Sequence, residues 1–206
     1  MEIQLYLSFC LAAFLMALMP GPDNLYVVTE SLAKGKRNGL WIAFGLNSGV
    51  LVHTIAVASG LSLALKKSDE VFLAITYLGV AYLLYLAYQA AKEEPMNLAE
   101  ASSSKKDKAT KLYRTGLLMN LLNPKVSLFF IAFLPQFVRE EANWSVFHQF
   151  VLLGITFMLV GFITFASFAF LAHQLRRLIQ KPAFWKATKW IKVIVLLFMA
   201  SLLLWV

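Results

Sequence analysis

Two charged residues follow proline breaks inside strongly apolar parts of this sequence. Asp23 comes directly after the "PGP" at 20–22, and Lys125 comes directly after Asn123 and Pro124. A charge near the centre of a membrane span costs about 2.5–3.5 kcal/mol on insertion scales, so it normally faces a cavity or a partner. Because an aspartate can bind an ammonium group and a lysine a carboxylate, the two are candidates for binding a zwitterion.

Each of the two charges also has other roles that the sequence leaves open. Asp23 could carry a coupling proton, or it could cap a half-helix that begins at Asn24, since Asp is a favourable N-cap residue. Lys125 could neutralise Asp23 across the interface between the two breaks, in which case substrate binding would compete with the pair. Many proline kinks in membrane helices only shape packing, and this structural role is the alternative to a binding site at both breaks.

A helical stripe in another apolar segment adds a titratable group. Gly45, Gly49 and His53 recur every four residues and therefore lie along one helix face. The glycines form a G-xxx-G surface suited to close helix approach, while His53 is a candidate proton relay, with a hydrogen-bonded packing role as the alternative. Gly154 and Gly161 are seven residues apart, which predicts an equivalent packing face. Four further polar residues are suited to line a path, with no individual role assigned: Asn47, Asn120, Thr156 and Thr164.

The segments that must position these residues are long enough to cross a lipid bilayer. Hydrophobic residues make up 60% of the chain and charged residues only 15%, with a mean hydropathy of +0.69, against an apolar share of about half in soluble domains. Lipid requires each segment to satisfy its own backbone polar groups. We therefore predict an all-α, polytopic membrane protein with six transmembrane helices of about 20 residues, near 4–33, 39–65, 71–91, 112–138, 146–172 and 190–206.

The two proline breaks fall near the midpoints of the first and fourth predicted helices. Since these two helices cross the membrane in opposite directions, we predict two inverted three-helix repeats, 1–92 and 112–206, joined by a hydrophilic linker at 93–111. Interrupted helices at corresponding positions of inverted halves are the best sequence indication of a transporter's binding site. The N–H groups at each restarting half-helix are also suited to hold a carboxylate.

The distribution of basic residues predicts the orientation of the chain. The formal net charge is +8, with 19 Lys and Arg residues. Fifteen of them, from Lys34 to Lys192, are assigned to the connections between spans 1 and 2, 3 and 4, and 5 and 6, against three in the opposite loops. The positive-inside rule places both termini outside and the basic connections in the cytoplasm, beside anionic lipid headgroups. The basic excess therefore indicates topology, and we predict no nucleic-acid partner.

Metal, cofactor and enzyme chemistry are not favoured. With one cysteine, Cys10, the chain has no internal disulfide, and its three histidines show no metal-ligand spacing. We therefore predict no metal site, no cofactor and no enzyme activity. A membrane-embedded lipid-modifying enzyme would need a convergent catalytic set, and no Ser-His-Asp ordering or Asp-rich motif is present. Ion or metal efflux remains an alternative, although the chain has no clustered intramembrane carboxylates.

Four motifs, in order from residue 20 to residue 137, carry a family resemblance. They are "PGPDNLYVV" at 20–28, "GLNSGVLVHT" at 45–54, "YLGVAYLLYLAY" at 77–88 and "GLLMNLLNPKVSLFFIAFLPQF" at 116–137. With these motifs the chain resembles the lysine exporter (LysE/RhtB) superfamily of amino-acid efflux proteins. The resemblance implies export of amino acids or close derivatives across the bacterial cytoplasmic (inner) membrane, driven by proton exchange. It also implies two substrate-binding motifs: Gly21, Pro22, Asp23 and Asn24 in the first broken helix, and Asn123, Pro124 and Lys125 in the second.

The substrate and the oligomeric state are less closely defined. One acid and one base near the breaks suit a zwitterion better than a strongly cationic substrate, which favours small neutral amino acids such as threonine, homoserine or leucine. Proton antiport would use Asp23 or His53 as the coupling group. The last span, "WIKVIVLLFMASLLLWV", has no glycine where the resemblance leads us to expect small-residue contacts. Whether the chain forms a homo-oligomer stays open.

Overall fold

The computed structural model describes residues 3–19, 21–61, 69–92, 108–139, 142, 144–179 and 181–204. The regular secondary structure of these residues is entirely helical, and the predicted all-α class is confirmed. Pro20, Lys66, Lys67 and positions 93–107 of the predicted linker lie outside the described residues. The division into two repeats with a linker therefore stays a prediction.

The first apolar span consists of two helices that meet at an angle. α1 (Ile3–Leu18) and α2 (Pro22–Lys34) are bent by 56° at the break. Gly21 is the N-cap of α2 and has an extended backbone, and Pro22 is the first helical residue, where a missing N–H removes no helical hydrogen bond. Asp23 therefore lies inside the first turn, and its alternative role as the cap of a helix beginning at Asn24 is wrong.

The fourth apolar span is interrupted in the same way. It comprises α6 (Ala109–Leu121), α7 (Pro124–Leu128), the π-helical turn η3 (Phe129–Phe133) and the 3-10 turn η4 (Leu134–Phe137). The bend at its break is 57°. Asn123 caps α7, because its side-chain oxygen accepts a hydrogen bond of 3.0 Å from the backbone N–H of Lys125. The predicted proline interruptions of both helices are thus confirmed, with nearly equal bends.

The remaining elements are α3 (Lys36–Ala56), which continues into the π-helical turn η1 (Val57–Leu61), α5 (Asp69–Lys92), α8 (Val146–Ile179) and α9 (Pro182–Leu204). Among the described helices, two single ones are long and apolar enough to cross a membrane, at Lys36–Gly60 and Val146–Ala172, and four spans result if each bent pair counts as one. The polytopic membrane class is confirmed. The count of six spans and their inverted arrangement stay predictions.

α9 begins at Pro182, eight residues before the predicted start near 190. Proline is favoured at the first position of a helix. The residues that follow it, 183–189, include two lysines and are helical although the segment is less apolar than the predicted span. Lys186, Lys189 and Lys192, predicted to lie in the connection before the last span, all lie inside α9, and Lys192 is buried. The assignment of Lys192 to a connection is therefore wrong.

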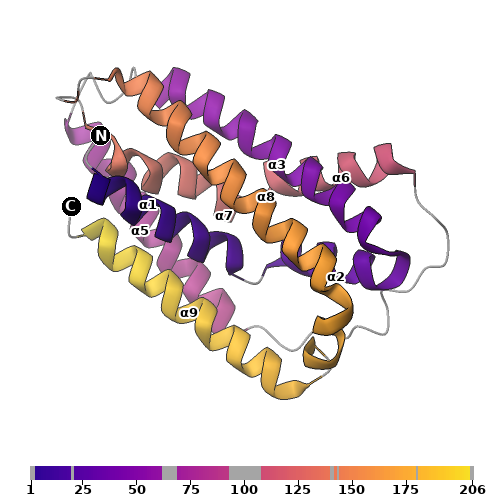
Figure 1. The fold of residues 1–206 in the computed structure, drawn as a ribbon. Helices are drawn as coiled ribbons and strands as arrows, with labels where there is room; N and C mark the ends of the chain where they lie inside the picture. Colours follow the sequence, from indigo (N-terminus) through magenta and orange to yellow (C-terminus); the bar gives the residue numbers. More distant parts are fainter. Residues whose placement is uncertain are drawn as a thin grey trace.

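The helices pack as one bundle around the two breaks. α3 packs along α6 and α8, α5 packs along α9, and α1 and α2 both lie against α8. Figure 1 shows both chain termini at one end of the bundle, with the α2–α3 junction and the start of α6 at the opposite end. The break after α1 lies in the interior of the bundle, where Met19 and Asp23 are buried, whereas Leu122 at the break after α6 is 78% exposed.

Small residues allow the closest of these helix contacts. A Cβ atom at Gly45 would overlap the backbone carbonyl of Tyr113, and one at Gly116 would overlap the carbonyl of Ile42. A Cβ at Gly49 would lie 2.5 Å from the Oδ1 atom of Asn120. Residues with side chains would therefore push α3 and α6 apart.

Candidate functional site

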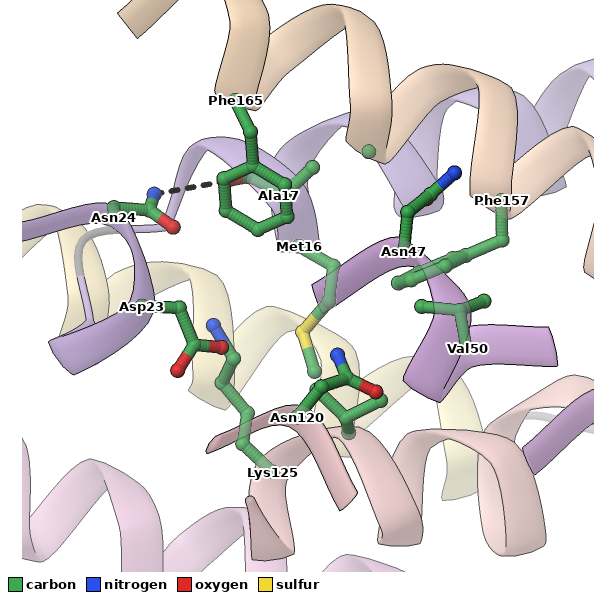
Figure 2. Close-up of a pocket in the computed structure, with 12 residues that line it drawn as sticks. Met16, Ala17, Asp23, Asn24, Asn47, Val50, Asn120, Lys125, Phe157 and Phe165 are labelled. Atoms are coloured by element: carbon green, nitrogen blue, oxygen red, sulfur yellow. Dashed lines mark hydrogen bonds between the residues drawn. The ribbon is translucent and has the colours of Figure 1, made fainter. Parts of the chain in front are cut away.

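The two breaks meet at a hydrogen bond between residues 100 positions apart. Nδ2 of Asn123 donates to Oδ2 of Asp23 over 2.7 Å, and Asp23 is only 4% exposed. Lys125 interacts electrostatically with this carboxylate. Within the described part of the chain, however, no ion pair of 4.0 Å or less joins Asp23 to Lys125. The hydrogen bond across the breaks therefore comes from Asn123. Figure 2 shows the end of the Lys125 side chain beside the carboxylate of Asp23.

Asn24 holds the first break in its bent form. Its Nδ2 atom donates to the carbonyl oxygens of Ala17 at 2.9 Å and Met19 at 3.3 Å, with a longer contact to Leu18 at 3.5 Å. The last carbonyls of a helix have no partner within the helix, and in lipid they need one. Asn24 supplies this hydrogen-bond partner for the last carbonyls of α1, and Asn123 supplies the N-cap of α7. Each break thus carries one asparagine that satisfies freed backbone groups.

A small cavity lies between the breaks and the helices α3 and α8 (Figure 2). Its polar lining comprises Asp23, Asn24, Asn47, Asn120 and Lys125. The volume open to the centre of a water molecule is about 20 Å³, which is room for about one water. An amino acid would therefore fit only if the side chains that line the cavity moved.

The apolar lining includes one flexible side chain and two aromatic rings. Met16 is 1% exposed, and its thioether lies in Figure 2 between the charged residues and Asn120. Phe157 packs its ring 4.9 Å from that of Phe129, which ties this wall to η3. Phe165 lines the cavity from the same helix, α8. No sequence pattern separates these residues from the many other apolar residues of their helices.

A second lysine, in α9, acts on the charge of Lys125. Lys192 of α9 is 8% exposed and interacts electrostatically with Lys125. Lys125 therefore lies in the field of one carboxylate and one like charge. A Cβ at Gly21 would lie 3.6 Å from Nζ of Lys125, which is ordinary van der Waals contact, so the lysine head group lies directly beside the first break.

The remaining predicted residues lie around the cavity at different distances. Nε2 of His53 lies 3.4 Å from the backbone oxygen of Asn120, one residue before the end of α6. All three residues of the predicted stripe thus contact α6. A Cβ at Gly154 would overlap Thr54 of α3, whereas one at Gly161 would have Asn47 Oδ1 as its nearest neighbour, at 3.9 Å. Gly161 therefore lines the cavity and makes no tight helix contact of the kind seen at Gly154.

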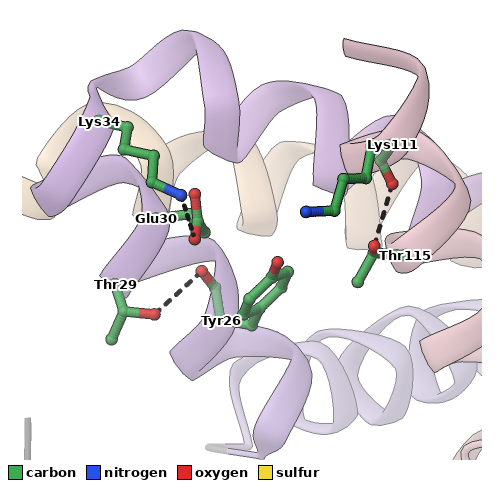
Figure 3. Close-up of polar contacts among 6 residues, drawn as sticks. All are labelled: Tyr26, Thr29, Glu30, Lys34, Lys111 and Thr115. Carbon is green, nitrogen blue, oxygen red and sulfur yellow. Dashed lines mark hydrogen bonds and ion pairs between the residues drawn. The ribbon is translucent and has the colours of Figure 1, made fainter. Parts of the chain in front are cut away.

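A polar cluster between α2 and α6 was not singled out from the sequence. Lys34 Nζ pairs with Glu30 Oε1 at 3.3 Å, and Glu30 is 8% exposed. Figure 3 shows the Lys111 side chain of α6 extending toward this pair, with Tyr26 of α2 nearby. The spacing of four residues between Glu30 and Lys34 could have indicated this ion pair from the sequence, because residues four apart lie on the same helix face.

Two interrupted helices that meet at a polar cavity inside an all-helical membrane bundle are the arrangement expected at the binding site of a membrane transporter. The sequence matches the family described as LysE type translocator over residues 14–205. The chain belongs to this family of membrane transporters.

Individual relatives cover nearly the whole chain. An uncharacterized membrane protein of Vibrio cholerae is 32% identical over 183 residues, covering 88% of this chain and 87% of that protein. The uncharacterized membrane protein YrhP of Bacillus subtilis is 29% identical, covering 92% of this chain and 93% of that protein. The homoserine/homoserine lactone efflux protein of Salmonella typhimurium is 28% identical, covering 91% of this chain and 89% of that protein. No solved structure matches.

Proposed function

We propose that this protein is a secondary active transporter that exports small neutral amino acids, such as homoserine, threonine or leucine, across the bacterial cytoplasmic membrane. The observation that carries the proposal is the Asp23–Asn123 hydrogen bond beside Lys125, since it joins the two helix breaks around one acid and one base. Membership of the translocator family supports transport. The relatives named as homoserine/homoserine lactone efflux proteins support an amino-acid substrate and outward transport.

The charges of the cavity suggest how the substrate is held. In this proposal the ammonium group of Lys125 binds the substrate carboxylate. The carboxylate of Asp23 binds the substrate ammonium, which replaces the hydrogen bond from Asn123. An acid and a base with a small gap between them favour a zwitterion, because a purely cationic ligand would meet the repulsion of Lys125 and Lys192.

In the proposed mechanism, proton antiport uses competition between the substrate ammonium and a proton for one carboxylate. Asp23 can bind either the substrate ammonium or a proton, so a proton taken up from outside would release the amino acid on that side. His53 remains the second candidate for coupling, because it contacts the end of α6 beside the second break. Substrate access requires the closed cavity to open alternately to each side, by movement of the half-helices about their two bends.

The orientation with both termini outside is part of the proposal. The helix ends that carry Lys34, Arg37 and Lys111 lie at the end of the bundle opposite to the termini (Figure 1). The positive-inside rule assigns that end to the cytoplasm. The Glu30–Lys34 pair then lies on the cytoplasmic side of the cavity, between α2 and α6.

An efflux measurement tests the proposed function. Cells that overproduce the protein should hold less labelled homoserine, and a protonophore should abolish the difference. Asp23→Asn and Lys125→Gln should each lower the export rate at least tenfold, which corresponds to loss of one hydrogen bond to a charged group, about 1.5–3 kcal/mol. The exposed residues Glu70 and Lys36 provide the matched controls Glu70→Gln and Lys36→Gln. Unchanged amino-acid pools together with altered lipid composition would instead favour an enzyme, and the proposal would be wrong.

A further inference from the structure

Two amide side chains of the cavity have unused hydrogen-bonding capacity. Asn47 of α3 and Asn120 of α6 both line it. The Oδ1 atom of each is buried and has no hydrogen-bond partner, and Asn120 as a whole is only 2% exposed. Nearly all buried polar groups in proteins are hydrogen-bonded, and an unpaired one is costly. Because they also line the cavity, these two amides can accept a hydrogen bond from a ligand or a water that occupies it.

We propose that Asn47 and Asn120 form a subsite for a hydrogen-bonding side chain of the substrate, with a hydroxyl group as the preferred ligand. The proposal rests on the proposed function, because it assumes that an amino acid enters this cavity. It deepens that function by separating hydroxyl-bearing amino acids such as homoserine and threonine from aliphatic ones such as leucine.

The charged and the neutral polar side chains belong to two different parts of the cavity lining. In Figure 2 the Met16 side chain lies between Asp23 and Lys125 on one side and Asn120 and Asn47 on the other. The first part carries the charges that suit the ammonium and carboxylate common to all amino acids. The second part carries neutral amides, which suit a polar side chain. Methionine is unbranched and adaptable, so Met16 can move aside to join the two parts when a substrate binds.

The Oδ1 atom of each amide lies beside a glycine of a neighbouring helix. The Oδ1 atom of Asn120 is 2.5 Å from the position a Cβ would take on Gly49, so a larger residue there would displace it. Asn47 Oδ1 faces Gly161, whose missing side chain leaves space beside it. The cavity has room for about one water, and that water can satisfy the amides until a substrate hydroxyl replaces it.

This arrangement predicts a selectivity between isosteric substrates. A site with buried polar groups rejects a ligand that leaves them unpaired, whereas an apolar pocket discriminates little against an added hydroxyl. Homoserine and norvaline differ by a hydroxyl in place of a methyl group, as do threonine and valine. With one or two neutral hydrogen bonds at stake, we expect the hydroxyl compound to bind about tenfold more tightly in each pair.

Counterflow in proteoliposomes measures this selectivity without a proton gradient. The purified full-length protein exchanges internal homoserine for labelled external homoserine, and each unlabelled compound is titrated as a competitor. The readout is the norvaline-to-homoserine ratio of the concentrations that halve the exchange. The variants are Asn47→Ala and Asn120→Ala, with Asn47→Ser as a rescue that keeps a hydrogen-bonding group. Asn38→Ala is the matched control, since Asn38 lies on the same helix, also has an unpaired buried amide atom, and does not line the cavity.

The expected result is a wild-type ratio near ten that falls toward one in Asn47→Ala and Asn120→Ala and is kept in Asn38→Ala and in Asn47→Ser. A wild-type ratio near one overturns the proposed subsite, and this measurement does not depend on the stability of any variant. An unchanged ratio in both cavity variants also overturns it. If the wild type exchanges no amino acid at all, the proposed function itself fails. Exchange without hydroxyl selectivity refutes the subsite alone.

Discussion

The contact between the two breaks can be tested by replacing Asn123 with alanine. This side chain makes two separate hydrogen bonds in the structure. Its Nδ2 atom donates to the buried carboxylate of Asp23 at 2.7 Å, and its Oδ1 atom accepts from the backbone N–H of Lys125 at 3.0 Å. Asn123→Ala removes both, so it should destabilise the junction of the half-helices.

The expected magnitude follows from the two bonds. A hydrogen bond to a charged group contributes about 1.5–3 kcal/mol, and replacing an Asn N-cap with Ala costs about 1 kcal/mol. The sum is about 3 kcal/mol, allowing for some overlap between the two losses. For a chain of 150–250 residues, 1 kcal/mol shifts the melting temperature by about 2–4 °C. We therefore expect Asn123→Ala to melt about 6–12 °C below the wild type.

The assay is thermal unfolding of the purified protein in detergent, followed by intrinsic tryptophan fluorescence. Asn123→Asp separates the two contributions, because it keeps an oxygen that can cap α7 but replaces the donor with a second carboxylate opposite Asp23. It should be at least as destabilising as Asn123→Ala, since like charges in a poorly hydrated site repel. Asn38→Ala serves as the control. If Asn123→Ala and Asn123→Asp both melt within about 1 °C of the wild type, the two breaks do not meet as described.

Two further substitutions test the packing around the site. Gly45→Ala should lower the melting temperature by several degrees, because its Cβ would overlap the Tyr113 carbonyl and overpacking costs about 1–3 kcal/mol. Gly60→Ala is the control, since a Cβ there would have nothing within 4 Å. If the two variants melted at the same temperature, the result would contradict a close contact between α3 and α6. Met16→Ala should destabilise by about 2–5 kcal/mol while relaxing the size limit of the cavity, so that larger amino acids such as leucine compete better in counterflow. An unchanged order of competitors would show that Met16 does not restrict the site.

The sequence by itself determined the membrane class and the places where two helices break. Both are local or compositional properties. Long apolar segments need no tertiary context to be recognised, and proline lacks a backbone N–H wherever it lies. The position of Asp23 and Lys125 directly after the breaks followed from the same reading, as did the stripe of Gly45, Gly49 and His53, because helical periodicity assigns residues four apart to one face.

The tertiary structure decided which groups meet across the bundle. The sequence left four partners open for Asp23: a substrate ammonium, a coupling proton, a helix N-terminus and Lys125. In the structure its carboxylate accepts a hydrogen bond from Asn123, which was not among them. That choice depends on two bends of 56° and 57° and on side-chain conformations that no spacing encodes. The burial of Lys192 in α9 likewise depends on the packing of that helix.

The cavity itself is also a tertiary property. Met16, Phe157 and Phe165 line it from α1 and α8, and nothing in their local sequence distinguishes a cavity wall from the surrounding apolar core. Gly154 and Gly161 share one helix face, yet only Gly154 packs tightly against Thr54. The physical reason is that periodicity specifies the direction in which a residue points along its own helix, whereas the distance to the facing helix is set by all the contacts of the bundle together.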